Sequence, residues 1–284
     1  MNSASTTKIY GLLGASLGHS LSPAMHNAAF RELGIDGQYR LFEKRPEEIE
    51  PFLKNLDKEN IWGFNVTVPY KEKVLEFVSF DDEYIKKVGA VNTIVRRDNG
   101  LYAFNTDVQG FGIHLKRVFG EPAGKKVALL GAGGAARAVC CLLAGASVAK
   151  IAIFDIDKAK SEGIVRMIKS FSPGCDIEIV NSIEELKIND KDLLINATPI
   201  GLKESDPCLV GEEMLHKDLF VYDLIYNPAE TKLLALAKKT GAKYSNGLGM
   251  LISQGAQSFK YFTQTRTSLD VIVKIMEKAL KKGA

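Results

Sequence analysis

Short apolar stretches alternate with amphipathic ones along this chain of 284 residues. In the first third, stretches rich in β-branched and aromatic residues predict strands at 9–14, 38–43 and 62–69. Helical patterns lie between them. The first predicted helix has Ser22 as its cap, Pro23 at its first position and Gly34 at its end.

The same alternation continues to the end of the chain. A hairpin is predicted over 88–106, around the turn Asp98-Asn99-Gly100. Further strands, most of them separated by helices, indicate a parallel sheet, and two helices close the chain. The predicted fold class is therefore α/β with two domains. The pattern indicates an α/β domain, a second α/β domain and a helical tail.

The segment Asn65–Lys71 carries the first chemical signal. Val66 and Val68 are predicted to face a core, so Asn65 and Thr67 share the opposite face of the strand. Pro69 begins a predicted helix, whose N-terminus disfavours the charge of Lys71. Two neutral hydrogen-bonding groups and one amine indicate a polar substrate site. Taken alone, the segment also suits an edge strand with a solvated lysine.

A glycine-rich turn predicts a dinucleotide site. Residues 131–136, Gly-Ala-Gly-Gly-Ala-Ala, follow an apolar strand and open an apolar helix, as in the GxGxxG/A fingerprint. Gly131 permits the tight turn, Gly133 lets the backbone approach a pyrophosphate, and Ala136 lets the helix pack closely. The helix N-terminus offers free N–H groups to the anion. A tight turn without a ligand is the poorer interpretation.

The next strand ends in acidic residues that bear on the choice of cofactor. Asp155 lies where a carboxylate accepts hydrogen bonds from ribose hydroxyls, and with Asp157 it would repel a 2′-phosphate. Lys158 and Lys160 lie nearby and weaken this argument. The prediction is NAD, with NADP as the alternative.

Composition narrows the class of protein further. Hydrophobic residues make up 46% of the chain, charged residues make up 25%, and the net charge is only +3. These values are typical of globular proteins and give no sign of a nucleic-acid partner. The most apolar stretch, 138–149, is too short to span a membrane. The cysteines show no CxxC spacing and the histidines no zinc-site spacing, so we expect a cytoplasmic protein without a metal.

Several segments together resemble the shikimate dehydrogenases and the related quinate/shikimate 5-dehydrogenases over nearly the whole chain. The matching segments, in the order of that family, are HSLSPAMHN (19–27), GFNVTVPYKE (63–72), GAVNT (89–93), NTDVQGF (105–111), GAGGAARA (131–138), NATPIGL (196–202), DLIYNPAET (223–231) and GLGMLISQGAQSF (247–259). The resemblance implies reversible reduction of 3-dehydroshikimate to shikimate, in the pathway to aromatic amino acids, with a nicotinamide cofactor. It also implies that residues 1–107 and 248–284 form a mainly parallel substrate-binding domain, to which the C-terminal helices return, and that 108–247 form a Rossmann-type domain.

The resemblance also implies residue roles. Lys71 and Asp107 would be the catalytic pair. The substrate carboxylate would lie on Ser20 and Ser22, and the remaining substrate contacts would come from Asn65, Thr67, Asn92, Tyr226 and Gln254, together with Asp107. The dinucleotide would contact Gly131, Ala132, Gly133, Gly134, Ala135, Asp155 and Asp157, and its nicotinamide would contact Thr198, Pro199, Ile225, Gly247 and Met250.

Two departures from the family pattern matter. Ser16 stands where the family usually has a proline, which leaves the shape of that loop open. Many members carry Asn-Arg-Thr after the second strand, whose arginine binds the 2′-phosphate, whereas this chain has Asp155-Ile156-Asp157. The missing arginine favours NAD and keeps an NAD-dependent quinate/shikimate dehydrogenase as the alternative. A dinucleotide sensor without activity is a further alternative, and the expected assembly is a monomer or a homodimer.

Overall fold

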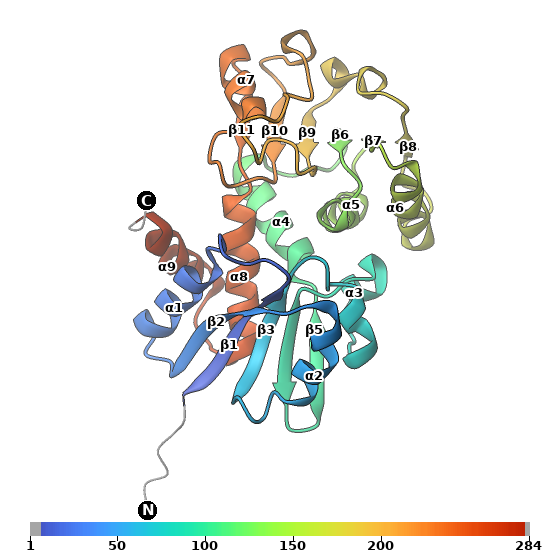
Figure 1. The fold of residues 1–284 in the computed structure, drawn as a ribbon. Helices are drawn as coiled ribbons and strands as arrows, with labels where there is room; N and C mark the ends of the chain where they lie inside the picture. The colour runs from blue at the N-terminus through green and yellow to red at the C-terminus, as the bar shows by residue number, and fades with distance from the viewer. Residues whose placement is uncertain (1–6, 282–284) are drawn as a thin grey trace, which may run out of the picture. The chain divides into compact units, whose positions relative to one another are not determined.

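The computed structural model describes residues 7–281 (Figure 1). The chain divides into two compact units. Unit 1 contains the residues up to Gly110 and those from Ile252 onward, and unit 2 is Phe111–Leu251. Both divisions fall inside helices, α4 (Thr106–Val118) and α8 (Leu248–Thr263), a few residues beyond the divisions expected at 107 and 247.

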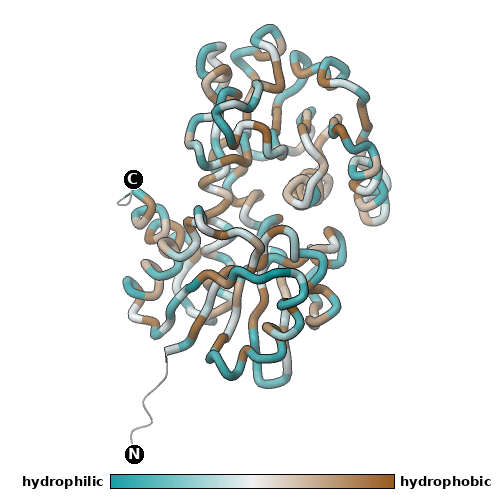
Figure 2. The backbone as a smooth tube through the Cα atoms, viewed as in Figure 1, coloured by the Kyte–Doolittle hydropathy of each residue, from teal (hydrophilic) through white to brown (hydrophobic). Residues whose placement is uncertain are grey.

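Unit 1 is built on a mixed sheet. Its strands are β1 (Lys8–Gly14), β2 (Gly37–Glu43), β3 (Ile61–Val66), β4 (Thr93–Arg97) and β5 (Gly100–Phe104). Their order is β2-β1-β3-β4-β5; β1 pairs in parallel with β2 and β3, whereas β4 is antiparallel to both of its neighbours. The predicted hairpin is therefore confirmed, and its hydrophilic tip stands out in teal beside the brown stretches of the strands (Figure 2).

Helices cover both faces of this sheet because its strands alternate apolar side chains between the two sides. Ile9 and Leu13 of β1 pack with α2 (Ile49–Lys54) and α3 (Glu83–Val88). Tyr10, between them, faces the opposite side and packs its ring on Phe30 of α1 (Ser22–Glu32) and Phe262 of α8. The last helix, α9 (Leu269–Lys281), packs on α1.

The segment after β3 differs from the prediction. The strand ends at Val66, and the chain turns so that the Tyr70 N–H donates to the Thr67 carbonyl, at 3.0 Å. The turn breaks the alternation: Val68 is 70% exposed, and Tyr70 takes the buried position instead. The predicted helix is only a 3₁₀ segment at Lys73–Phe77, so Lys71 does not lie at the N-terminus of an α-helix.

Unit 2 is built on a sheet whose strands are all parallel. The strands are β6 (Lys126–Leu130), β7 (Lys150–Phe154), β8 (Ile177–Ile179), β9 (Leu193–Asn196), β10 (Phe220–Asp223) and β11 (Lys243–Ser245). Their order, β11-β10-β9-β6-β7-β8, is the doubly wound order of dinucleotide-binding proteins. The strand order reverses between β6 and β9, which is where such folds bind ligands. The helices α5 (Gly134–Gly145), α6 (Lys158–Phe171) and α7 (Lys232–Thr240) complete the unit.

The observed helices and strands confirm the predicted α/β class. No helix in the described part of the chain is long and apolar enough to cross a membrane.

Candidate active site

Lys71 and Asp107 form an ion pair in unit 1. The Lys71 Nζ lies 2.6 Å from the Asp107 Oδ2, and both side chains are largely buried, at 22% and 13% exposure. The backbone holds Lys71 in place, because its carbonyl accepts a hydrogen bond from the Val91 N–H at 2.8 Å. The two groups are 36 positions apart in the sequence, so only the fold brings them together.

The carboxylate of the pair is fixed by the start of α4. Asp107 lies in the first turn of this helix, where the helix dipole stabilises a negative charge. Asn105 caps the same turn: its Oδ1 accepts from the N–H groups of Asp107 and Val108, at 3.1 and 3.4 Å. Its amide also donates to the Ala90 carbonyl at 2.9 Å, which ties the helix to the chain before β4. Asn105 was not predicted, although an asparagine before a helix is a typical capping signal.

Two amides that the resemblance assigns to substrate binding, those of Asn92 and Gln254, lie beside the pair. The Asn92 Nδ2 donates to the Asp107 Oδ1 at 2.8 Å and to the Thr106 Oγ1 at 2.9 Å. The Thr106 N–H returns a hydrogen bond to the Asn92 Oδ1 at 2.7 Å, which fixes the orientation of this amide. The Gln254 Oε1, from α8, lies 3.3 Å from the Asn92 Nδ2. Lys71, Asp107, Asn92 and Gln254 therefore form one cluster.

Asn65 lies deeper, and its amide is engaged with the protein. Its Oδ1 accepts from the Tyr39 hydroxyl at 2.8 Å, and its Nδ2 lies 2.8 Å from the Ser258 Oγ and 3.0 Å from the Thr93 Oγ1. Asn65 is 6% exposed. The structure thus places Asn65 beneath the cluster, whereas Thr67 follows the strand and is half-buried. Tyr39, Thr93 and Ser258 were missed by the sequence analysis.

The serine pair shows a different geometry from the one expected at the start of α1. Leu21, not Ser22, is the N-cap residue, and Ser22 is the first residue of the helix. The Ser20 Oγ accepts from the Ser22 N–H at 3.2 Å, so Ser20 serves the start of the helix. Accepting this bond leaves the Ser20 hydroxyl hydrogen available to an anion.

In unit 2, the glycine-rich turn follows β6 as predicted. Gly131 adopts a φ of 96°, and a Cβ there would lie 2.9 Å from the carbonyl group of Ala197 at the end of β9. Gly133 and Gly134 differ from Gly131, because a Cβ at either position would meet no atom of residues 7–281 within 4 Å. The turn therefore packs tightly on the protein at Gly131 and is open at the N-terminus of α5, where Ala135 lies in the first turn. These residues fit the pyrophosphate of a dinucleotide.

The acidic residues after β7 hold the backbone around that turn. The Asp155 Oδ2 accepts from the Ala132 N–H at 2.6 Å, and its Oδ1 accepts from the Asp157 N–H at 2.7 Å. Asp157 caps α6 through the Ala159 N–H, at 3.1 Å. Ile156 between them is 96% exposed. The carboxylate expected to meet a ribose thus also orders the glycine-rich turn.

A buried Asn196–Asp223–Thr231 network supports the loops expected to contact the nicotinamide. The Asp223 Oδ1 accepts from the Asn196 Nδ2 and the Ile225 N–H, both at 3.0 Å, and its Oδ2 accepts from the Thr231 hydroxyl at 2.7 Å. The Asn196 Oδ1 accepts from the Thr198 hydroxyl at 2.7 Å. Burial raises the pKa of the Asp223 carboxyl.

This network fixes the chain around the other expected residues. Pro199 follows Thr198, and Tyr226 follows Ile225, whose carbonyl accepts from the Gly247 N–H at 3.1 Å. Gly247 has no room for a Cβ beside the Leu224 carbonyl. Met250 is buried in the first turn of α8.

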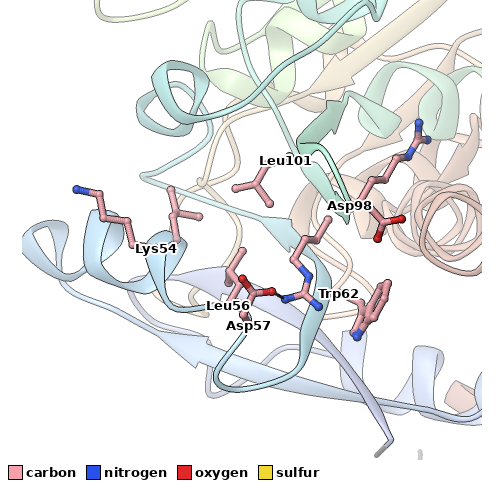
Figure 3. Close-up of a pocket in the computed structure, with 10 residues that line it drawn as sticks. Lys54, Leu56, Asp57, Trp62, Asp98 and Leu101 are labelled. Carbon is pink, nitrogen blue, oxygen red and sulfur yellow. Dashed lines mark hydrogen bonds and ion pairs between the residues drawn. The ribbon is translucent and has the colours of Figure 1, made fainter. Parts of the chain in front are cut away.

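A separate pocket of about 430 Å³ lies in unit 1 at the opposite end of the sheet (Figure 3). It is lined by Trp62 at the start of β3 and by residues at the tip of the β4–β5 hairpin, such as Asp98 and Leu101. An ion pair between Arg96 and Asp57 crosses this region. None of the predicted site residues lines the pocket.

These observations define the class of protein. The strand order and the glycine-rich turn of unit 2 are those of dinucleotide-binding domains, and unit 1 presents an amine and a carboxylate suited to proton transfer. A protein with both is an NAD(P)-dependent oxidoreductase.

Comparison with known proteins identifies the family. Residues 12–94 match the family model described as "Shikimate dehydrogenase substrate binding domain". A shikimate dehydrogenase (NADP(+)) from Caldanaerobacter subterraneus subsp. tengcongensis is 43% identical over 91% of this chain and 92% of that protein.

Two crystal structures agree with this assignment. Shikimate dehydrogenase from Aquifex aeolicus has a TM-score of 0.87 and 35% identity, over 96% of this chain and 97% of that one. Shikimate 5-dehydrogenase from Listeria monocytogenes, in complex with shikimate and NAD, has a TM-score of 0.86 and 35% identity, over 95% and 96%. The chain belongs to the shikimate dehydrogenase family, whose members are oxidoreductases acting on a CH–OH group.

Proposed function

We propose that this protein catalyses reversible hydride transfer between 3-dehydroshikimate and shikimate, with NAD favoured over NADP. The observation that carries the proposal is the buried pair of Lys71 and Asp107, joined by Asn92 and Gln254 in a family that acts on shikimate. A cytoplasmic location and assembly as a monomer or homodimer stay predictions from the sequence.

The chemistry assigns roles to the residues of unit 1. Oxidation of a secondary alcohol removes a hydride from carbon and a proton from oxygen. The nicotinamide cofactor, when bound, accepts the hydride. Lys71, in its neutral amine form, would accept the hydroxyl proton, and in the reverse direction its ammonium form would donate that proton to the developing alkoxide. Asp107 would hold Lys71 in place and accept a hydrogen bond from a ring hydroxyl.

The remaining residues would bind and orient the substrate. Ser20 and Ser22 would hold the substrate carboxylate by hydrogen bonds that add no charge. Thr67 and Gln254, with the amides of Asn65 and Asn92, would face or support the ring hydroxyls, and Tyr226 would border the ring. These roles come from the resemblance, and for Asn92 and Gln254 the clustering around Asp107 supports them.

The preference for NAD rests on the residues after β7. Two carboxylates, Asp155 and Asp157, and the exposed Ile156 stand where many family members carry Asn-Arg-Thr. A 2′-phosphate there would meet negative charge and no arginine, whereas ribose hydroxyls can donate to Asp155. The relative from Caldanaerobacter is named for NADP, whereas the Listeria structure contains NAD. The same residues favour quinate/shikimate dehydrogenase activity as the second candidate.

Steady-state kinetics over the four pairs of NAD or NADP with shikimate or quinate test these proposals. We expect the highest kcat/KM with NAD and shikimate. Equal efficiency on quinate would replace the proposal by the second candidate, and a preference for NADP would refute the role of Asp155. Dinucleotide binding without turnover of either substrate would indicate a sensor instead of an enzyme.

A further inference from the structure

Ser258 is a fully buried hydroxyl at the centre of the polar network of unit 1. It lies on α8, and its Oγ contacts three side chains: the Asn65 Nδ2 at 2.8 Å, the Thr93 Oγ1 at 2.8 Å and the Thr106 Oγ1 at 3.0 Å. It also donates to the Gln254 carbonyl, one turn earlier, at 2.9 Å. Nothing in the sequence analysis or the expected substrate set assigns it a role.

Counting hydrogens limits the directions that these bonds can take. A serine hydroxyl has one hydrogen and two lone pairs, and the Gln254 carbonyl can only accept, so the hydrogen of Ser258 points there. Its two lone pairs can then accept from two partners, the Asn65 Nδ2 and the Thr106 hydroxyl, whereas the Thr93 hydroxyl can donate to the Asn92 Oδ1 at 3.2 Å. The Asn65 amide turns its Nδ2 toward Ser258 because its Oδ1 already accepts from Tyr39. Ser258 is thus the shared acceptor of the network.

The network ends at the catalytic pair. The Thr106 Oγ1 accepts from the Asn92 Nδ2, so its own hydrogen is available to Ser258. Asn92 in turn donates to Asp107. The Ser258 Oγ, at 3.0 Å, is the nearest acceptor for the hydrogen of the Thr106 hydroxyl. Removing the Ser258 hydroxyl removes this acceptor. The hydroxyl then turns toward the Asn92 Oδ1 or the Gln254 Oε1, at 3.2 and 3.3 Å.

We propose that Ser258 is a positioning residue that sets the orientation of Asn92 and, through it, of the Asp107 carboxylate beside Lys71. The expected effect of Ser258 on turnover rests on the proposed function, whereas its hydrogen bonds are independent of that function. Ser258 contacts no reacting group, so its effect is on alignment, to which proton transfer and hydride transfer are both sensitive.

The test compares Ser258→Ala with Ser253→Ala. Ser253 is a similarly buried serine on the same helix, and its side chain makes none of the hydrogen bonds described for the network around Ser258. We expect Ser258→Ala to lower kcat with shikimate roughly tenfold, with a much smaller change in KM, because alignment is lost and most binding contacts remain. Ser253→Ala should keep the kcat of the wild type. Ser258→Thr, which restores the hydroxyl, should recover most of the lost rate.

A second measurement does not depend on turnover. The side-chain amide NMR signals of Asn65 and Asn92 should shift in Ser258→Ala and stay in place in Ser253→Ala. If Ser258→Ala does not fold, Ser258→Cys keeps the volume and weakens the hydrogen bonds, and it should show the same shifts.

Two outcomes separate the two proposals. An unchanged kcat with unshifted Asn92 signals, or a kcat that Ser258→Thr does not restore, would overturn the positioning role. Wild-type protein that turns over neither shikimate nor quinate, but whose Asn92 signals shift in the variant, would refute the proposed function and leave the positioning role standing.

Discussion

At the scale of single residues, Lys71 is the side chain with the most specific assignment. Replacing it by alanine removes the group that would carry the substrate proton, so we predict a fall in kcat of ~10²–10⁴. Lys73→Ala is the matched control, because Lys73 is exposed and its ammonium donates to the Pro46 carbonyl outside the cluster. Steady-state rates with shikimate and NAD check both variants. A Lys71→Ala protein with a near-normal kcat would exclude Lys71 from proton transfer.

His26 allows a prediction about pH and stability. It stacks on Tyr39 at a ring distance of 4.1 Å, and its Nδ1 has no hydrogen-bond partner among the described residues. Burial lowers its pKa from 6.5 to about 3. The unfolded chain therefore takes up a proton below pH 6.5 that the folded protein does not bind. The free energy of unfolding should fall as the pH drops from about 6.5 toward 3, by about 1.4 kcal/mol per pH unit from this group.

The variant His26→Phe keeps an aromatic ring on Tyr39 and removes the titration. We predict that the free energy of unfolding of this variant depends less on pH between 7 and 5 than that of the wild type. The slopes should differ by up to about 1.4 kcal/mol per pH unit, which corresponds to one proton. Urea denaturation at three pH values measures both proteins. If the free energies of unfolding of the two proteins change with pH in parallel, either His26 is protonated in the folded state or it does not control the loss of stability at low pH.

At the scale of elements, two glycines of the glycine-rich turn are expected to serve different purposes, Gly131 in stability and Gly133 in dinucleotide binding. Gly131→Ala puts a Cβ against Ala197 at a positive φ, so we predict a loss of stability of about 1–3 kcal/mol. Gly133→Ala meets no atom within 4 Å in the described part of the chain and should fold normally. Its dissociation constant for NAD should rise by about tenfold or more, because the added methyl group takes the space for the pyrophosphate.

Thermal denaturation and calorimetric titration with NAD check this pair of variants. Gly163→Ala, at a half-buried position of α6 where the added Cβ would lie 3.9 Å from Arg137, is the control for a methyl group that meets no close contact. Unchanged NAD affinity in Gly133→Ala would mean that the dinucleotide does not approach the turn there.

The elements also show how far sequence patterns reach. The strands of both sheets and the hairpin follow from runs of apolar residues and from turn residues, which act over a few positions. The start of α1 and the segment after Pro69 were predicted wrongly for a related reason. At each place a single local hydrogen bond, from Ser22 to Ser20 and from Tyr70 to Thr67, outweighs the pattern.

At the scale of the whole molecule, sequence order hides the contacts that matter most. Lys71 and Asp107 lie 36 positions apart, and this spacing gives no sign that they are in contact. They were paired because eight segments of the chain resemble a known family. Ser258 and Asn65 lie 193 positions apart, and both are ordinary polar residues in their own segments. Patterns of hydrophobicity carry no sign of such a pairing, which exists only once α8 packs on the sheet of unit 1.

Unit 1 is discontinuous: its sheet comes from the first part of the chain and two of its helices come from the last. A ribosome therefore releases the amine, the carboxylate and Asn65 long before it releases the serine that joins them. Unit 2 is contiguous and can fold while synthesis continues. The nascent protein would then form the sheet of unit 2 before Ser258 can join the network of unit 1, and a product that stops before α8 would lack this alignment.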